Sequence, residues 1–247
     1  MIRRRFGIFP GVGPRAERQI AQAGLGDWNA FTRDPAASGL PARLQANLQE
    51  AIGVWSNALE QGDPAFFARN LARKHHWMLY ERFAGRICYL DIETTGLSPR
   101  SDVVTMVGLY DGRRFTCLVR DQDLTAENLA ACLADCGMLV TYYGSSFDLS
   151  FLRRGFPRID WDLPHFDLCF AGKRVGLTGG LKSIERQLGI VRDPSLVEVD
   201  GFEAVRLWHA HRRGDAAALP RLRAYNEADT VNLERIASTI YQRLCGL

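Results

Sequence analysis

Apolar runs in the middle of the chain predict β-strands. The clearest run covers residues 87–92, where aromatic and β-branched residues are frequent and a turn-forming glycine soon follows. Similar runs at residues 103–110 and 114–119 lie close behind it, so we expect these strands to form a meander. A further strand begins near Leu139 and breaks at Gly144, where an amphipathic helix is expected to start soon afterwards.

Apolar residues at helical spacing dominate the last part of the chain. Residues 205–212 and 219–244 predict helices, and Gly214-Asp215 separates them. Residues 55–83 are also expected to be helical. Because strands come first and helices follow, the pattern predicts an α/β fold in which helices flank a mixed sheet.

Length and composition agree with one such domain and a smaller appendage. The chain has 247 residues, of which 47% are hydrophobic. We place the boundary after residue 86, with a small helical region in residues 1–86 and the α/β domain in residues 87–247. Six cysteines show no paired framework and are expected to be reduced. We find neither a signal peptide nor an apolar stretch of about 20 residues, so we expect a cytoplasmic protein that does not enter a membrane.

Charge is distributed unevenly between these regions. Residues 1–86 contain 12 Lys+Arg against 7 Asp+Glu, whereas residues 87–247 contain 19 against 21. A basic region suits a polyanion, and an acidic region suits bound cations. Arginine is far more frequent than lysine, and it suits bidentate contacts to phosphate, although the arginine bias of a GC-rich genome accounts for more of this excess.

Asp91 and Glu93 belong to the first predicted strand, near its end. Side chains alternate across a strand with period two, so both carboxylates project from the same face. Two buried carboxylates at that spacing repel each other and need a partner, which divalent cations would supply. The alternative is a solvent-facing acidic pair on an edge strand.

Further acidic side chains occur at places that suit the same site. Asp148 lies just beyond a strand end, in the first turn of a predicted helix, where capping or pairing with the helix dipole is the alternative role. Tyr225 and Asp229 are four residues apart on a later helix and share its inward face. An inward Asp must be paired, hydrogen-bonded or bound to metal, whereas Tyr225 is alternatively a core aromatic residue.

Together these motifs resemble the DEDD 3′-to-5′ exonuclease superfamily of the RNase H-like fold. The motifs are Asp-x-Glu-Thr-Thr-Gly at residues 91–96, Phe147-Asp148 at a helix start, and Tyr-x-x-x-Asp at residues 225–229. The tyrosine places the chain in the DEDDy subgroup. A run such as residues 180–185 and a Tyr-Asn-x-x-Asp motif are also found in the YprB-like family. The resemblance covers about residues 87–240 and implies an RNase H-like mixed β-sheet.

The resemblance also implies a reaction and a set of site residues. Asp91, Glu93, Asp148 and Asp229 would bind two Mg²⁺ or Mn²⁺ ions, and oxygen ligands suit these hard cations. Tyr225 would orient the attacking water, because an ordinary tyrosine with a pKa near 10 is a poor base at neutral pH.

Other residues are expected to hold or support the substrate. Thr94, Gly96 and Lys182 are candidates for contacts to nucleic acid. Asp167 would either support the site or cap the helix that follows it. Many exonucleases of this superfamily have an Asn shortly before the second-motif Asp, and this chain has Tyr143 and Gly144 there instead. How the terminal nucleotide is held therefore stays open.

The N-terminal region offers candidates for phosphate binding. Residues 8–20 resemble the hairpin and second helix of a helix-hairpin-helix motif, with Gly11, Gly13 and Arg15 near the phosphate. Too few residues precede them for a full first helix, and a Gly-Pro turn that packs the arm is the alternative. Arg73 and Lys74 would line the path of a strand, or would belong to a solvated basic face.

We therefore expect a metal-dependent 3′-to-5′ exonuclease that acts on single-stranded DNA or RNA, with DNA slightly favoured by the N-terminal motif. The polarity is implied by resemblance alone. The alternatives are an exoribonuclease of RNA processing and a catalytically inactive scaffold that binds nucleic acid. No residue points to a particular protein partner.

Overall fold

The computed structural model describes residues 1–196 and 201–246, and over these residues the strands form one five-stranded sheet. Its order is β3-β2-β1-β4-β5. The strands are β1 (Ile87–Thr94), β2 (Val104–Tyr110), β3 (Phe115–Val119), β4 (Met138–Thr141) and β5 (His165–Asp167). The pairs β1–β2 and β2–β3 are antiparallel, while β1–β4 and β4–β5 are parallel. This confirms the predicted α/β fold, the mixed sheet and the meander.

The two faces of the sheet pack against different helices. Helices α5 (Ala126–Leu133) and α6 (Asp148–Gly155) cover the face that carries Cys88, Leu90 and Ile92. The long helix α10 (Ala218–Cys245) covers the face that carries Ile87 and Tyr89. Because side chains alternate along β1, Asp91 and Glu93 project from the same face as Ile87 and Tyr89, toward α10.

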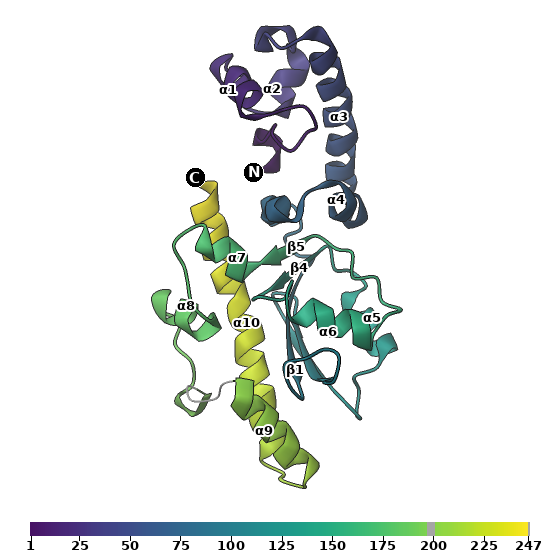
Figure 1. Cartoon of the computed structure of the whole chain (residues 1–247), viewed down its shortest axis with the longest axis vertical. Coiled ribbons are helices and arrows are strands. Elements are labelled where there is room, and N and C mark those ends of the chain that lie inside the picture. Colours follow the sequence, from purple (N-terminus) through teal and green to yellow (C-terminus); the bar gives the residue numbers. More distant parts are fainter. Residues whose placement is uncertain (197–200, 247) are drawn as a thin grey trace.

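Shorter helices lie beside α10 on the same side of the molecule (Figure 1). They are α7 (Leu168–Lys173), α8 (Leu181–Gln187), the 3₁₀ helix η4 (Pro194–Leu196) and α9 (Gly201–Arg212). Gly214, whose φ is +96°, lies between α9 and α10, so the predicted break is confirmed. Residues 197–200 lie outside the described part of the chain.

The N-terminal region is helical, as predicted, but residues 55–83 do not form one helix. The elements are η1 (Ile2–Arg4), α1 (Pro14–Gln22), α2 (Trp28–Arg33), η2 (Ala36–Ser38), α3 (Ala42–Gln61), α4 (Pro64–Asn70) and η3 (Arg73–Leu79). Gly62 ends α3 in the left-handed conformation, and the Asp63 carboxylate caps α4, with Pro64 at its first position. Extended backbone at Leu71 and Ala72 then separates α4 from η3.

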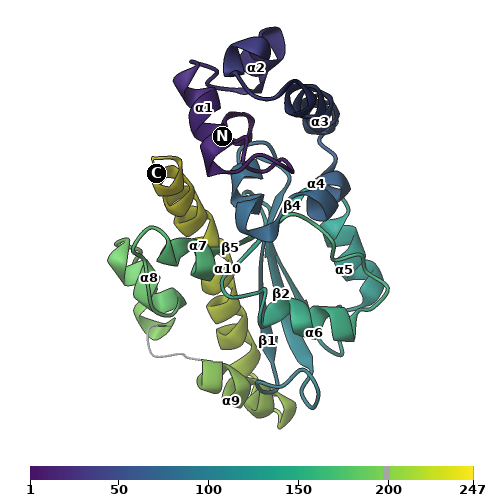
Figure 2. The same ribbon diagram turned by 45° about the horizontal axis from the view of Figure 1, so that its top comes forward.

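Aromatic residues form the centre of the N-terminal region. The ring of Phe9 lies 5.2 Å from that of Trp28 and 5.3 Å from that of Trp55. Phe67 and Phe83 continue this cluster toward the sheet, where it joins the core beneath α10. Helices α1 to α3 form the far end of the molecule, and α4 connects them to the α/β domain (Figure 2).

Local geometry around the N-terminal glycines resembles the expected turn. Gly11 has a φ of +82°, Gly13 precedes α1, and Pro14 is the first residue of that helix. The short η1 precedes this turn. Gly11, Gly13 and Arg15 are exposed. Phosphate binding by this segment stays a prediction.

Across residues 1–196 and 201–246, no helix is both long and apolar enough to cross a membrane. All six cysteines lie within these residues and none of them forms a disulfide.

Candidate active site

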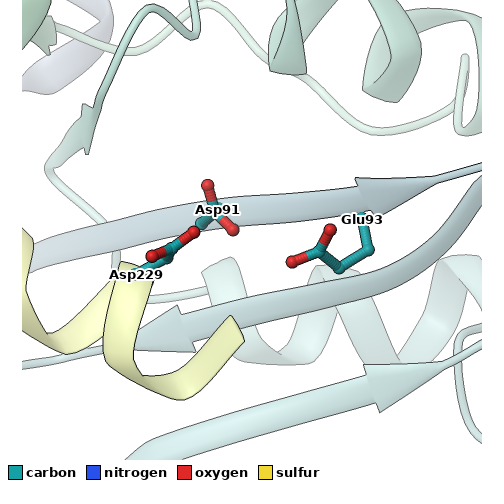
Figure 3. Close-up of side chains that lie close together, drawn as sticks. All are labelled: Asp91, Glu93 and Asp229. Atoms are coloured by element: carbon teal, nitrogen blue, oxygen red, sulfur yellow. The ribbon is translucent and has the colours of Figure 1, made fainter. Parts of the chain in front are cut away.

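Acidic side chains from the sheet and from α10 meet on one side of β1. Ligand oxygens of Asp91, Glu93 and Asp229 all lie within 4.8 Å of one another. Figure 3 shows these three carboxyl groups beside strand β1, with Asp229 reaching in from α10. Asp148 and Tyr225 line the same cavity of about 180 Å³, which we call the acidic cavity. The structure thus brings together the five residues that the sequence suggested for metal binding and water positioning.

A glycine on β2 allows α10 to come this close. Gly108 pairs with Asp91 across the β1–β2 ladder. A Cβ atom at Gly108 would lie 2.2 Å from Oδ1 of Asn226 and 2.4 Å from Oγ1 of Thr230, both on α10. The absent side chain therefore sets the separation between helix and sheet, and with it the position of Asp229.

Asp148 reaches the cavity from the opposite face of the sheet, through the loop that follows β4. Pairing between β1 and β4 ends at Tyr89–Val140, and the Asp148 carboxylate accepts a hydrogen bond from the Ile92 amide beyond that point. The loop contains Tyr143, whose φ of +67° is rare for a residue with a side chain. Such a conformation persists only where its surroundings hold it.

Asp167 holds this loop. Its Oδ1 accepts hydrogen bonds from the amide of Tyr143 at 3.0 Å and from that of Cys169 at 3.1 Å. Its Oδ2 accepts from the amide of Ser145 at 3.0 Å and from the Ser145 hydroxyl. Asp167 therefore caps α7 and also fixes the turn that leads to Asp148, which combines the two roles that the sequence left open.

Burial and mutual repulsion raise the pKa of the clustered carboxyl groups. For Asp91, burial is the largest cause, and the charges of Asp229, Glu93 and Asp148 add to it. Burial also raises the pKa of Glu93, with Asp229 and Asp148 as further causes, and it raises the pKa of Asp148 to about 7. The charged forms of these groups are thus disfavoured until a cation offsets them.

Arg192 supplies one such positive charge. Its guanidinium donates to both carboxylate oxygens of Glu185, at 2.6 and 2.7 Å, and it also forms an ion pair with Asp229. Both ion pairs are buried. One guanidinium between two carboxylates leaves an excess of negative charge. Among the described residues, no ion pair reaches Asp91, Glu93 or Asp148.

Tyr225 lies between these charged groups. Burial, followed by the charges of Asp229, Glu93 and Asp91, raises the pKa of its phenol far above the ordinary value, and the phenol is hydrogen-bonded to Asp229. The Lys182 ammonium and the Arg192 guanidinium lie 5.3 and 5.8 Å from the ring centre. In the metal-free protein the phenol therefore keeps its proton at neutral pH, which suits an orienting group better than a general base.

An unsatisfied oxygen in the cavity indicates that these residues fit a divalent cation. Glu93 Oε1 is buried and, within the described residues, accepts no hydrogen bond, whereas Asp229 Oδ1 is paired with the Arg192 guanidinium. Carboxylate oxygens without a donor are costly to bury, and they are the ligands that Mg²⁺ and Mn²⁺ prefer. The donor set, its spacing and its surplus of negative charge all agree with such an ion.

Three residues that shape the site were not predicted from the sequence: Gly108, Arg192 and Asn226. Gly108 and Arg192 have no local signal, because a β-strand glycine and a loop arginine gain their roles only from distant neighbours. Asn226 could have been identified from the sequence, because a polar residue on the inward face of a predicted helix usually has a specific partner. Its amide donates to Asp91 Oδ2 at 2.9 Å.

The expected nucleic-acid contacts do not all lie at the acidic cavity. Thr94 lines it, and its hydroxyl donates to the carbonyl of Gly96 at 2.5 Å. Gly96 packs closely against the Asp102 carboxylate, which leaves no room for a side chain. Arg73 and Lys74 line a separate cavity. Gly11, Gly13 and Arg15 belong to the N-terminal region and do not line the acidic cavity.

A family model for the RNase_H superfamily matches residues 88–241. The matched segment begins with β1 and ends near the end of α10, so it contains the sheet and the whole acidic cavity. No curated protein matches the chain.

Solved structures with a similar fold include nucleases and a polymerase. A nuclease in its apo form shares 21% identity at a TM-score of 0.50, over 67% of this chain and 76% of that one. Brucella melitensis NrnC bound to pGG shares 19% identity at a TM-score of 0.50, over 66% and 76%. The family B DNA polymerase of the archaeon Pyrobaculum calidifontis shares 16% identity at a TM-score of 0.53, over 62% of this chain but 24% of the polymerase. At these identities the likeness concerns the fold.

Proposed function

This chain belongs to the RNase_H superfamily, and on that basis we propose that it is a metal-dependent 3′-to-5′ exonuclease of the DEDDy type that degrades single-stranded nucleic acid. The observation that carries the proposal is the meeting of Asp91, Glu93 and Asp229 within 4.8 Å, with Asp148 and Tyr225 in the same cavity. The 3′-to-5′ direction comes from the resemblance of the three motifs to that subgroup. Brucella NrnC, bound to pGG, offers a precedent for a short nucleic-acid ligand on this fold.

Asp91, Glu93, Asp148 and Asp229 would hold two ions such as Mg²⁺ or Mn²⁺, which activate water and stabilise the leaving oxygen of a phosphodiester when bound. The protein's own groups prepare that site. Asn226 orients Asp91. Asp167 fixes the loop that presents Asp148. Arg192, anchored by Glu185, orients Asp229.

Tyr225 would position the nucleophile. Its phenol remains protonated and is hydrogen-bonded to Asp229, so it can hold a water molecule in line with the scissile phosphate without removing its proton. Tyr225→Phe keeps the ring and removes the hydroxyl. We expect kcat to fall about a hundredfold or more, while the free energy of unfolding changes by about 1 kcal/mol. An unchanged kcat would make Tyr225 a packing residue.

The central experiment follows cleavage of end-labelled oligonucleotides. Single- and double-stranded DNA and RNA are incubated with the protein in Mg²⁺, in Mn²⁺ and in EDTA. We expect a ladder of shorter products from 5′-labelled single strands, in metal only, and its loss in Asp91→Asn. Asp135→Asn, at an exposed carboxylate outside the cavity, is the matched control and should keep full activity.

The same experiment separates the remaining alternatives. Faster degradation of RNA than of DNA would make the protein an exoribonuclease, whereas the helix-hairpin-helix-like turn at Gly11 and Gly13 slightly favours DNA. Binding of all strands without cleavage in either metal would support an inactive scaffold. Retention of cleavage in both Asp91→Asn and Asp229→Asn would refute the proposed metal site.

A further inference from the structure

A second cavity, of about 250 Å³, lies beside the proposed active site, and we call it the basic cavity. It is formed where η3 of the N-terminal region meets β5 and α7. Its lining residues include Arg73, Lys74, Trp77, Phe170 and Arg174. Arg73, Lys74 and Arg174 are exposed and Phe170 is about half exposed, so positive side chains accompany an accessible aromatic ring, while Trp77 itself is buried.

Tyr143 connects the basic cavity with the acidic one. It lines the acidic cavity, and its ring lies 5.9 Å from that of Phe170, with 33° between the ring planes. Both side chains are about half exposed, at 47% for Tyr143 and 45% for Phe170. Half-exposed aromatic rings beside each other offer a surface that a flat ligand can cover.

The position of Tyr143 is enforced by its surroundings. Its φ of +67° is held by the hydrogen bond from its amide to Asp167, and Asp167 also binds Ser145. Gly144 follows, and a Cβ atom there would lie 2.2 Å from the Thr141 hydroxyl oxygen. The Tyr143 backbone is therefore fixed in a costly conformation that places an aromatic ring in solvent.

Cations lie close to the aromatic rings of the basic cavity. The Lys173 ammonium is 5.4 Å from the centre of the Phe170 ring, and the Arg174 guanidinium is 5.6 Å from that of Trp77. Arg174 also donates to the Lys74 carbonyl at 3.3 Å, which ties α7 to η3. The carboxylate in the lining, Asp167, accepts hydrogen bonds from Tyr143, Ser145 and Cys169, so its charge is stabilised locally.

We propose that the basic cavity and the Tyr143–Phe170 pair bind a nucleotide of the substrate strand, upstream of the phosphate that enters the acidic cavity. An unpaired base stacks on the two rings, and the adjoining phosphates contact Arg73, Lys74 and Arg174. This inference rests on the proposed function. It also gives the N-terminal region a role in substrate binding through η3.

The test measures binding separately from cleavage. In an Asp91→Asn background, fluorescence anisotropy gives the Kd for a single strand of about ten nucleotides, and competition with that strand gives the Kd for a nucleoside 5′-monophosphate, which has no upstream nucleotide. Phe170→Ala should weaken binding of this longer strand about 5- to 100-fold, because it removes one stacking surface, and should leave binding of the monophosphate unaffected. Phe170→Tyr keeps an aromatic ring and should restore the affinity.

The charged residues predict a second, independent readout. Lys74→Gln should reduce the slope of log K against log salt by about 0.7 for the longer strand, as expected for one lost contact to single-stranded phosphate. Arg113→Gln is the matched control, because Arg113 lies in the hairpin between β2 and β3, at the edge of the sheet that is farthest from β5. It should change neither the Kd nor the slope.

The outcomes distinguish this inference from the proposed function. If Phe170→Ala and Lys74→Gln weaken binding while the parent protein cleaves no strand, the basic cavity binds nucleic acid and the exonuclease proposal is wrong. If the parent protein cleaves but both variants bind like the Asp91→Asn parent, the basic cavity is not part of the strand path and the inference is overturned. Unchanged melting temperatures show that the variants are folded.

Discussion

At the scale of single residues, Arg192 connects the charge of the candidate site with the stability of the fold. Its guanidinium is buried between Glu185 and Asp229 and lies against the Tyr225 ring. Asn232 donates to Glu185 at 2.8 Å and completes the anchor. In the absence of metal, Arg192 is the group that offsets the charge of Asp229.

Replacement of Arg192 should therefore destabilise the metal-free protein strongly. Arg192→Met leaves Glu185 and Asp229 buried without a cation, which costs about 3–5 kcal/mol of unfolding free energy. Denaturant melts in EDTA measure this loss. Arg206→Met is the control, since Arg206 forms a solvent-exposed pair with Glu203 and should change stability by about 1 kcal/mol or less.

Mg²⁺ should stabilise Arg192→Met more than it stabilises the parent protein. If a metal ion binds Asp229, it replaces part of the lost positive charge, so Mg²⁺ should raise the midpoint of Arg192→Met more than that of the parent. An equal increase in both proteins would separate Arg192 from the metal site.

At the scale of elements, features with a local sequence signal were predicted correctly, whereas features that depend on contacts between distant residues were not. The strands from β1 to β3, the start of α6 at Asp148 and the break before α10 were predicted, because each has a periodic or turn-forming local signal. The strand and helix periodicities also predicted that Asp91 and Glu93 share one face of β1 and that Tyr225 and Asp229 share one face of α10. The helical character of residues 55–83 was predicted, but the breaks that divide this segment at Gly62 and Asp63-Pro64 were not.

The approach of α10 to the sheet could not be predicted, because it depends on a contact between residues more than a hundred positions apart. Gly108→Ala tests this contact. The added methyl group would collide with Asn226 and Thr230, so we expect a loss of about 1–3 kcal/mol in unfolding free energy, together with loss of metal-dependent cleavage. Gly53→Ala, in α3 with open space around it, should instead stabilise by about 0.5–1 kcal/mol. Full activity in Gly108→Ala would show that α10 needs no such close fit.

The junction of β5 with η3 predicts a pH dependence of stability. The amide of His165 donates to His76 Nδ1 at 2.9 Å, and Nε2 of His165 is hydrogen-bonded to the Thr141 hydroxyl at 2.8 Å. Burial lowers the pKa of His165 from 6.5 to about 4, with the charges of His76, Arg73 and Arg153 as further lowering causes and that of Asp167 opposing them. The folded protein therefore binds this proton less readily than the unfolded chain.

The stabilisation from neutral His165 is complete above pH 6.5 and is lost as the pH falls toward 4, by about 3 kcal/mol in all. The raised pKa of Asp148 acts in the opposite direction, so the measurement must compare two proteins. Denaturant melts of the parent and of His165→Gln between pH 7 and 4 give the difference. The parent should lose more stability on acidification, and parallel curves would exclude His165 as the cause.

At the scale of the whole molecule, the predicted boundary after residue 86 does not coincide with a gap in the packing. Tyr80 and Tyr89 share a hydrogen bond of 2.7 Å between their hydroxyls. The Arg86 guanidinium contacts the carbonyls of Gly62 and Asp135, at 3.0 and 3.2 Å. The buried core runs without interruption from Phe9 and Trp28 to the residues of α10. We therefore expect residues 1–86 and the α/β domain to unfold together.

Tryptophan fluorescence tests this expectation, because Trp28, Trp55 and Trp77 lie in the N-terminal region. In a Trp161→Phe, Trp208→Phe protein they report on that region alone. Denaturant unfolding should give a single transition that coincides with the loss of circular dichroism. Metal at the acidic cavity binds only the folded state, so Mg²⁺ should also shift the midpoint of the tryptophan signal, although these residues do not line that cavity. Two transitions, of which Mg²⁺ moves only the one that is silent in fluorescence, would show that the N-terminal region folds independently and that η3 can detach from β5 without opening the candidate active site.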